Sequence, residues 1–422
     1  MPIPWREAKG QRMRRLLVLG AGTAGTILVN KLSRRLSKTE WDIAVVDGSR
    51  SHVYQPGLVF VPFGRYEEAD LMRPTRAQLP AGVSLIEGEV ELVDPGSNLV
   101  RLVDGTEIEY DQLVIATGTH PRPDQTEGLM GDGWRTDVHE FYTHEGAFAL
   151  RDRLTRFAGG DLVVHVSEMP IKCPVAPLEF AFLADAHFRG KGMRDKVTIT
   201  YVTPLPGAFT KPIAGAHLGG MLESRGIGLE PDFMVEHVED GALVSYDERS
   251  IAFDLLVTVP VNMGAPFVGK SGLGDELDHV RVDPHNFLVP DTDNVFAIGD
   301  AAALPTSKAG SSAHFAVDVF CENFVEHIDG HPMTHSYDGH ANCFVESGDG
   351  KALLIDFNYD TEPLPGSFPF AGVGPMRLLK ETRLNHLGKL AFEPVYWNVL
   401  LPGRWLPIST DMSMTGKHRP ES

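Results

Sequence analysis

The sequence has very few cysteines: only Cys173, Cys321 and Cys343 occur in 422 residues. Three cysteines in so long a chain cannot form the disulfide framework of small secreted proteins, and they favour a reducing compartment. Long apolar runs are missing too, since no stretch reaches the roughly 18 continuous apolar residues of a membrane span. The first residues, MPIPWREAKGQRMRR, lack the apolar core of a secretory signal. We therefore expect a protein on the cytoplasmic side, with peripheral membrane contact left open.

Positive charge is also scarce, because 38 Lys and Arg face 57 Asp and Glu, which gives a net charge of −19. Binding to nucleic acid requires a basic surface, so we predict no nucleic-acid partner. We also predict no metal site. The remaining composition is ordinary for a loop-rich globular enzyme, with 42% hydrophobic residues, 43 glycines and 30 prolines. The length allows two or three domains with sizeable cores.

A complete βαβ unit stands near the start of the chain. The apolar run Leu16–Leu19 is typical of a strand buried on both faces, and Trp41–Val46 is typical of a second. Between them lie the pattern Gly20-x-Gly22-x-x-Gly25 and a helix expected over Thr26–Leu36. Asp47 ends the second strand, where an acid binds ribose hydroxyls in dinucleotide folds. A glycine pattern alone would indicate only a tight turn, but this context predicts a dinucleotide-binding loop.

Two later stretches resemble the flavin-contact motifs of the two-dinucleotide-binding disulfide reductase superfamily. They are Asp111–Gly118, which ends in Thr117-Gly118, and Asn294–Asp300, which ends in Gly299-Asp300. The resemblance implies that FAD is the cofactor and that Asp300 holds the ribityl chain. An N-cap for the next helix, expected over Ser312–Ile328, is a compatible structural role for Asp300.

A second βαβ unit is predicted from Leu162–Val166, Ala176–Phe188 and Val197–Val202, with Leu255–Val259 as its closing strand. Its loop, Ser167–Pro177, contains no glycine and three prolines, so the tight turn and close backbone approach to a pyrophosphate are missing. The next strand ends in Thr203-Pro204 without a ribose-binding acid. We therefore predict that this unit does not bind a nicotinamide nucleotide.

The predicted fold class is α/β, with two Rossmann-like dinucleotide-binding domains, the second without the nicotinamide fingerprint, plus a C-terminal amphipathic region. We expect a discontinuous FAD-binding domain over 14–121 and 283–330. The second domain, with the redox cysteine, is expected over 122–282, and a C-terminal region facing quinone and membrane over 331–422.

Cys173 replaces the glycines of the second loop. Its thiolate could be stabilised by Lys172 and by the dipole of the following helix, which favours a redox role over a buried structural cysteine. For Glu179 a solvated helix carboxylate is preferred over a proton carrier. His120 and His139 could act as acid–base groups, but a structural or exposed histidine is the commoner case. Cys321 lies on a predicted helix and is interpreted as core packing.

The segment Lys172–Glu179 resembles the cysteine segment of sulfide:quinone oxidoreductases. Pro305–Ser311, Cys343–Glu346 and Phe357–Asp360 also resemble that family, and the resemblance runs from about Arg14 to Pro407. It implies that Cys173 and Cys343 exchange sulfur with sulfide beside the flavin, that Lys308 contacts the cofactor, and that electrons leave to a quinone. The family analogy favours Cys343 as the cysteine that faces the flavin. Many members carry a further cysteine where Trp134–His139 has none, which indicates a divergent subtype.

The C-terminal stretch 374–406 is basic and rich in aromatic residues, with Leu384, Leu387 and Ala391 at helical spacing. Such a segment can lie in the headgroup layer of an anionic membrane, although packing on the body or a homo-oligomer contact would explain it as well. Phe357, Tyr359 and Tyr396 are candidates for a quinone pocket, with core packing at least as well supported. Two other functions stay open: a type II NADH:quinone-like or related oxidoreductase, and a flavin redox sensor without turnover. Flavocytochrome c sulfide dehydrogenase would need export and a haem partner.

Overall fold

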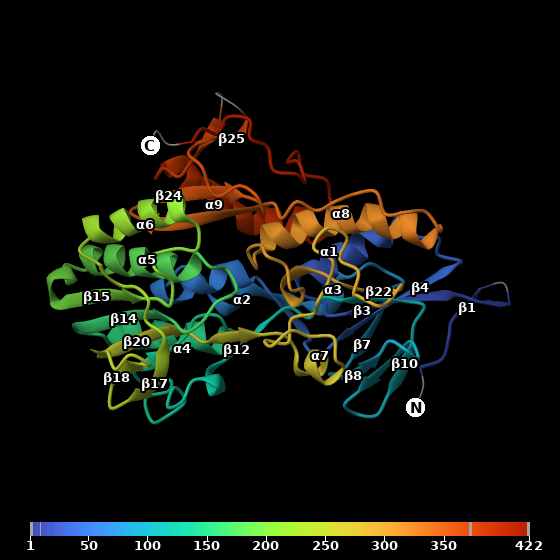
Figure 1. The fold of residues 1–422 in the computed structure, drawn as a ribbon, viewed down its shortest axis with the longest axis horizontal. Helices are drawn as coiled ribbons and strands as arrows, with labels where there is room; N and C mark the ends of the chain where they lie inside the picture. The colour runs from blue at the N-terminus through green and yellow to red at the C-terminus, as the bar shows by residue number, and fades with distance from the viewer. Residues whose placement is uncertain (1–2, 9, 371–373, 420–422) are drawn as a thin grey trace.

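The computed structural model describes residues 3–8, 10–370 and 374–419. Two parallel sheets lie side by side, and the C-terminal region lies above both, as Figure 1 shows. Helices α1 and α8 cover one sheet, and helices α5 and α6 cover the other. The predicted α/β class with two dinucleotide-type sheets is confirmed. The residue boundaries of the domains stay predictions, and positions 371–373 and 420–422 of the expected C-terminal region lie outside the described residues.

The first sheet has the strand order β22-β11-β3-β4-β7, and all of its pairings are parallel. Its strands are β3 (Arg14–Leu19), β4 (Trp41–Asp47), β7 (Ser84–Glu87), β11 (Gln112–Ile115) and β22 (Val295–Ala297). Alternate residues face opposite cores: Leu16 and Val18 pack toward the helices, whereas Leu17 and Leu19 pack on the other side. Burial on both faces explains the continuous apolar runs in the sequence.

Helices and short strands surround this sheet. Helix α1 (Thr23–Leu32) packs beside α8 (Gly310–Ile328). Helix α1 begins and ends earlier than expected, because Gly22 is its N-cap and the chain turns after Leu32. The remaining elements of this half are β5 (Ser51–Val53), a 3-10 helix (Gln55–Phe63), α2 (Glu68–Leu71), β6 (Met72–Pro74), α3 (Thr75–Gln78), β8 (Val90–Asp94), β9 (Leu99–Leu102) and β10 (Glu107–Glu109). At the N-terminus, β1 (Glu7–Ala8) pairs with β2 (Gln11–Arg12).

The second sheet has the order β13-β20-β14-β15-β16 and is also parallel. Its strands are β13 (Val138–His139), β14 (Gly160–Val166), β15 (Val197–Val202), β16 (Gly228–Glu230) and β20 (Leu255–Val259). Its helices are α4 (His144–Arg156), α5 (Ala176–Gly190) and α6 (Pro212–Ser224), and a small sheet of β17 (Val235–Glu239), β18 (Ala242–Ser245) and β19 (Ser250–Ala252) adjoins it. The antiparallel pair β12 (His120–Arg122) and β21 (Val261–Met263) carries the chain into and out of this half, before α7 (Pro266–Lys270).

The C-terminal region adds a sheet of order β23-β24-β26-β25 and the helix α9 (Arg383–Val395). Its strands are β23 (Ala341–Gly348), β24 (Lys351–Phe357), β25 (Gly366–Phe370) and β26 (Gly374–Leu378), and a π-helical turn (Tyr396–Leu400) follows α9. Strand β23 packs against α5 of the second half, so the C-terminal sheet joins the two halves. No helix in the described part of the chain has both the length and the apolar character to cross a bilayer.

Candidate functional site

The first glycine loop is tightly packed around two of its three glycines. Gly20 has φ of +103°, and a Cβ there would lie 2.5 Å from the Ala116 carbonyl oxygen. A Cβ on Gly25 would overlap the Gly20 carbonyl oxygen, whereas one on Gly22 would meet open space. Gly20 and Gly25 therefore let the turn close on itself. Gly22 leaves room for a ligand to approach the backbone.

The N-terminus of α1 is free to bind an anion. Gly22 supplies no side-chain cap, and the first turn of α1 contains no acidic residue. Asp47, at the end of β4, accepts hydrogen bonds from the backbone N–H of Ala21 (2.5 Å) and of Ser49 (2.6 Å), so its carboxylate is fixed beside the loop. Uncapped N–H groups with an acid next to them are what a pyrophosphate and a ribose require.

The other predicted cofactor residues lie at the same edge of the sheet. Gly118 follows β11 and has φ of +69°, and the buried Thr117 hydroxyl has no hydrogen-bond partner among the described residues. Gly299 follows β22 with φ of +66° and contacts Ala24 of α1. These positions lie at the carboxyl ends of neighbouring parallel strands, where ligands bind in open α/β sheets. Their arrangement fits FAD.

A cavity of about 150 Å³, partly open to solvent, lies between the two halves. Its walls include Thr23, Asp300, Lys308, Lys172 and Cys173. The Lys308 ammonium donates to the carbonyls of Asp300 (2.7 Å) and Ala302 (3.1 Å), and the Lys172 ammonium donates to the Thr119 carbonyl (3.0 Å). Burial lowers the pKa of Lys308 to about 8 and lowers that of Lys172, while Asp300 opposes the shift in both. The cavity therefore holds two cations bonded only to main-chain carbonyls, an environment suited to an anionic ligand.

Cys173 lies in the loop between β14 and α5, three residues before α5. Its N–H donates to the Lys308 carbonyl oxygen (2.7 Å), and its own carbonyl accepts from Ala176 (2.9 Å). Burial raises the pKa of its thiol, Cys343 raises it further, and Lys389 lowers it. Cys173 raises the pKa of Lys172, so these two residues interact electrostatically as expected, although the Lys172 ammonium is bonded to the Thr119 carbonyl. Lys389 of α9 is a further cation that favours the Cys173 thiolate.

Cys343 lies on β23 and is buried. Burial raises the pKa of its thiol to about 11, while Lys389 and the Ser307 hydroxyl lower it. All three cysteines are free thiols, and Cys173 and Cys343 are close enough to act on each other electrostatically. Their catalytic roles stay a prediction. Cys321 is fully buried on α8, in agreement with core packing.

Glu179 is not the solvated carboxylate that the sequence suggests. It is buried, and its carboxylate pairs with the Lys389 ammonium at 2.7 Å. It also accepts a hydrogen bond from the backbone N–H of Glu346 (3.1 Å), whose own carboxylate pairs with His386 at 2.7 Å. Burial raises the pKa of Glu179, and Lys389 opposes that rise. Lys389, Glu346 and His386 were missed because their partners are remote in sequence, 210 positions away for Lys389.

The other candidates lie apart from this cluster. His139 is buried and bonds through Nε2 to the Thr136 carbonyl, and His120 is exposed; neither lines the cavity. Tyr359 donates to the Pro284 carbonyl, and it and Phe357 also lie outside the cavity lining. Tyr396 does line the cavity, and its hydroxyl bonds to the Thr23 hydroxyl and to His52 Nε2, both at 2.7 Å.

The C-terminal stretch is only partly available for contact with a membrane. Leu387 is 58% exposed and Trp405 is 80% exposed, so both present apolar surface to solvent. Four members of the stretch pack into the core, in agreement with the alternative that it packs on the body: Tyr396, Trp397, Leu400 and Leu401.

Comparisons with known proteins agree over almost the whole chain. A family model described as pyridine nucleotide-disulphide oxidoreductase matches residues 14–319. The mitochondrial sulfide:quinone oxidoreductase of Dictyostelium discoideum is 26% identical over 412 residues, covering 96% of this chain and 89% of the relative. The mitochondrial enzyme of Mus musculus is 29% identical, covering 92% and 87%. The solved sulfide:quinone oxidoreductase of Aquifex aeolicus superimposes with a TM-score of 0.79 at 20% identity, covering 93% and 92%, which shows the shared fold.

Proposed function

The chain belongs to the pyridine nucleotide-disulphide oxidoreductase family and is an FAD-dependent oxidoreductase, and on that premise we propose that it oxidises sulfide and reduces a quinone. The observation that best supports this proposal is the electrostatic effect of Cys343 on the pKa of Cys173. The two thiols come from segments remote in sequence and interact beside the cavity that the flavin motifs form. The resemblance to relatives named for sulfide and quinone supports the same conclusion.

The residues of the first half would hold FAD. The α1 N-terminus at Gly22 would bind the pyrophosphate, Asp47 the ribose, and Asp300 the ribityl chain. Lys172 and Lys308 would place positive charge beside the isoalloxazine. FAD supplies the capacity to take two electrons from sulfur and pass them to the quinone.

The sulfur chemistry would begin with a Cys173–Cys343 disulfide or a sulfur bridge between them. Hydrosulfide attacks one sulfur, a persulfide forms there, and the other cysteine leaves as a thiolate. The Ser307 hydroxyl lowers the pKa of Cys343, which favours Cys343 as the leaving group. Lys389 favours the thiolate at either sulfur.

A nicotinamide donor fits this chain poorly. The loop between β14 and α5 has no glycine, and the N–H of Cys173 within it is already bonded to Lys308. The strand β15 is followed by Thr203, which is not an acid that could bind a ribose. The proposal therefore assigns the reducing equivalents to sulfur.

Steady-state assays test the cysteine pair. We expect Cys173→Ser and Cys343→Ser each to lower sulfide-dependent quinone reduction by at least about a thousandfold, because neither can form the sulfur bridge. Cys321→Ser is the matched control and should keep the rate. Wild-type rates in both serine variants would refute the catalytic role of the cysteine pair. Sustained NADH oxidation would indicate a type II-like NADH:quinone oxidoreductase. Slow bleaching of the flavin by sulfide, without turnover, would indicate a redox sensor.

We also propose peripheral membrane contact through 374–406, next to the quinone in the bilayer. Leu384, Leu387 and Trp405 are exposed there beside Arg383 and Arg404, whereas the Lys389 side chain of the same stretch is only 10% exposed and pairs with Glu179. Leu387→Asp with Trp405→Ala should weaken flotation with vesicles containing phosphatidylglycerol by about tenfold. Tyr246→Ala, at a residue that is 70% exposed on the second half, is the control. Equal flotation of the two variants would exclude this surface.

A further inference from the structure

Helix α5 and strand β23 run side by side, and one of the two cysteines lies close to the start of each element. Cys173 precedes α5, and Cys343 is the third residue of β23. The first link between the two elements is the Glu346 N–H, which bonds to Glu179. Cys343 lies three residues before Glu346 on the strand, and Cys173 lies in the turn that leads into α5, before Glu179. Both cysteines therefore precede this bond along the chain, and Cys343 raises the pKa of the Cys173 thiol.

Two further contacts fix this register beyond Glu179. Gly348, at the end of β23, has φ of +81°, and a Cβ there would lie 2.5 Å from Ala186 Cβ on α5. One turn later, Arg189 of α5 pairs with Asp349 at 2.9 Å. Residue numbers at the three contacts rise along both α5 and β23, so the helix and the strand run in the same direction. Sliding one element along the other would break all three contacts.

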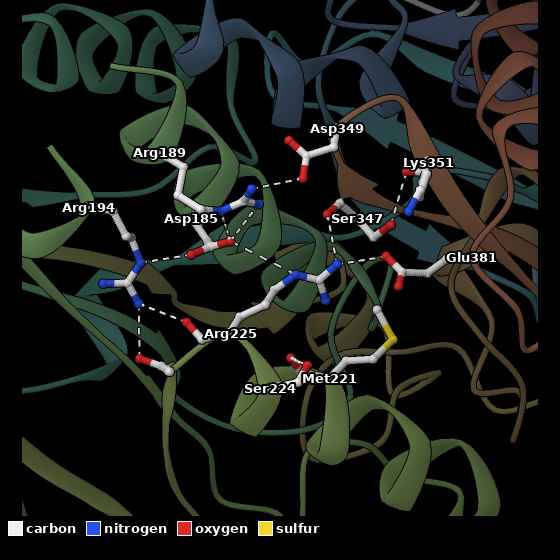
Figure 2. Close-up of polar contacts among 11 residues, drawn as sticks. Asp185, Arg189, Arg194, Met221, Ser224, Arg225, Ser347, Asp349, Lys351 and Glu381 are labelled. Carbon is white, nitrogen blue, oxygen red and sulfur yellow. Dashed lines mark hydrogen bonds and ion pairs between the residues drawn. The ribbon is translucent and has the colours of Figure 1, made fainter. Parts of the chain in front are cut away.

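A cluster of charged side chains lies toward the C-terminal ends of α5 and β23, as Figure 2 shows. Asp185 of α5 is buried and accepts from Arg194 (2.7 Å) and Arg189 (2.9 Å). Arg225, just after α6, approaches the same carboxylate at 3.9 Å and lies over the Phe182 ring of α5 at 4.7 Å. The cluster thus ties Arg225 to the helix that follows Cys173.

Arg225 reaches across to the C-terminal region. Its guanidinium donates to the Ser347 carbonyl on β23 (3.2 Å) and to the Glu381 carboxylate (2.7 Å), while its other side faces Asp185. The side chain is 15% exposed, so solvent screens these contacts little. A planar guanidinium with several fixed donors suits such a bridge better than a lysine would.

We infer that Arg225, with Asp185 and Glu381, is a positioning residue that holds α5 against β23 and thereby sets the distance between the Cys173 and Cys343 sulfurs. The inference rests on the proposed function of the cysteine pair. None of the three residues lines the cavity or touches either thiol, so their effect is mechanical. Its measurable consequence is the effective concentration of one thiol at the other, which depends steeply on small displacements.

The test measures that effective concentration in the FAD-loaded full-length protein. The protein is equilibrated with reduced and oxidised glutathione; glutathione disulfide takes two electrons from the two thiols, and one Cys173–Cys343 disulfide and two glutathione thiols form. Mass spectrometry of the trapped protein gives the disulfide fraction. We expect Arg225→Met to lower the effective concentration by roughly tenfold to a hundredfold. Asp185 keeps Arg189 and Arg194 as partners, so the fold should survive.

Arg153→Met is the matched control. Arg153 is 20% exposed and bonds to Asp137 and to the Asp254 carbonyl, so all its partners lie in the second half. We expect it to leave the effective concentration within about twofold of wild type even if it lowers Tm. Arg225→Lys should restore part of the effective concentration that Arg225→Met loses. Glu381→Gln should lower the effective concentration by a smaller factor. It provides a second variant if Arg225→Met folds poorly.

The outcomes separate the two proposals. A wild-type protein that forms no Cys173–Cys343 disulfide at any glutathione ratio would overturn the proposed cysteine pair, and this inference with it. A wild-type protein that forms it, with Arg225→Met and Glu381→Gln no different from Arg153→Met, would overturn the positioning role alone. A selective loss in the Arg225 and Glu381 variants at unchanged flavin content would support it.

Discussion

The loop between β3 and α1 and the loop between β14 and α5 occupy the same place in two similar βαβ units, and their chemistry differs. The first has Gly20, Gly22 and Gly25, so its backbone is open to a ligand. The second has prolines and Cys173, and the cysteine N–H is already bonded to Lys308. The shared fold supplies only a helix N-terminus at a sheet edge. The loop residues decide whether that position binds a nucleotide or presents a thiol.

Gly25→Ala should disrupt the first loop most strongly. The added Cβ would overlap the Gly20 carbonyl oxygen, a backbone atom that cannot move without opening the turn. We expect nearly complete loss of bound flavin and destabilisation of about 1–3 kcal/mol or more. Absorbance of the purified protein and thermal unfolding measure the two effects. Gly220→Ala on α6, where a Cβ meets no atom within 4 Å, is the control and should keep its flavin.

Gly22→Ala separates folding from ligand binding in the same loop. Its Cβ would meet open space in the protein, so the flavin-free form should unfold at nearly the wild-type temperature. The methyl group would still occupy the approach to the α1 N-terminus, and we expect FAD affinity to fall by at least about tenfold. Titration of flavin-free protein with FAD measures this. Unchanged affinity would mean that the loop does not contact the pyrophosphate.

Lys389→Met tests why the second loop suits a thiol. Lys389 lowers the pKa of Cys173 and of Cys343, so its removal raises both. A higher pKa leaves less thiolate at any given pH, and the pH profile of alkylation by iodoacetamide should move to higher pH. We expect reaction about tenfold slower at neutral pH, equivalent to about one pH unit.

A double variant controls for the charge that Lys389→Met leaves behind. Without Lys389 the buried Glu179 loses its ion-pair partner, which is costly unless the carboxyl takes up a proton. Glu179→Gln combined with Lys389→Met removes that cost and should be more stable, with a smaller shift in the same direction, because Glu179 raises the pKa of both thiols. A profile unchanged in both the single and the double variant would rule out Lys389 as the relevant cation.

Tyr396→Phe should have the smallest effect. It removes the hydrogen bonds through which the C-terminal region contacts Thr23 of the first loop and His52. We expect a loss of about 1–2 kcal/mol in the free energy of unfolding by urea. Tyr110→Phe is the matched control, because the buried Tyr110 hydroxyl has no partner among the described residues, and it should cost almost nothing. Equal losses would show that the Tyr396 bonds add no stability.

Local features of the sequence predicted the fold well. The helix expected to start at Ala176 does start there, because Pro174 precedes it and Pro177 stands in its first turn, where proline is tolerated. The paired apolar strands formed the expected sheets. The partners of single polar residues could not be predicted in this way. Glu179 was interpreted as solvated, and Lys389 was missed as a cation near Cys173, since Lys389 comes from a helix that only the tertiary fold brings near. Tyr396 is buried for the same reason.

The contact between Cys173 and Lys308 joins the loop between β14 and α5 to the segment before α8 through main-chain atoms alone: an N–H on one side and a carbonyl on the other. A peptide group keeps its geometry whatever side chain it carries. The charge in the cavity can therefore be altered by replacing Lys308, while the main-chain bond that holds Cys173 is retained. For a protein engineer this separates two properties that usually change together, the electrostatic potential of a redox site and the placement of its nucleophile.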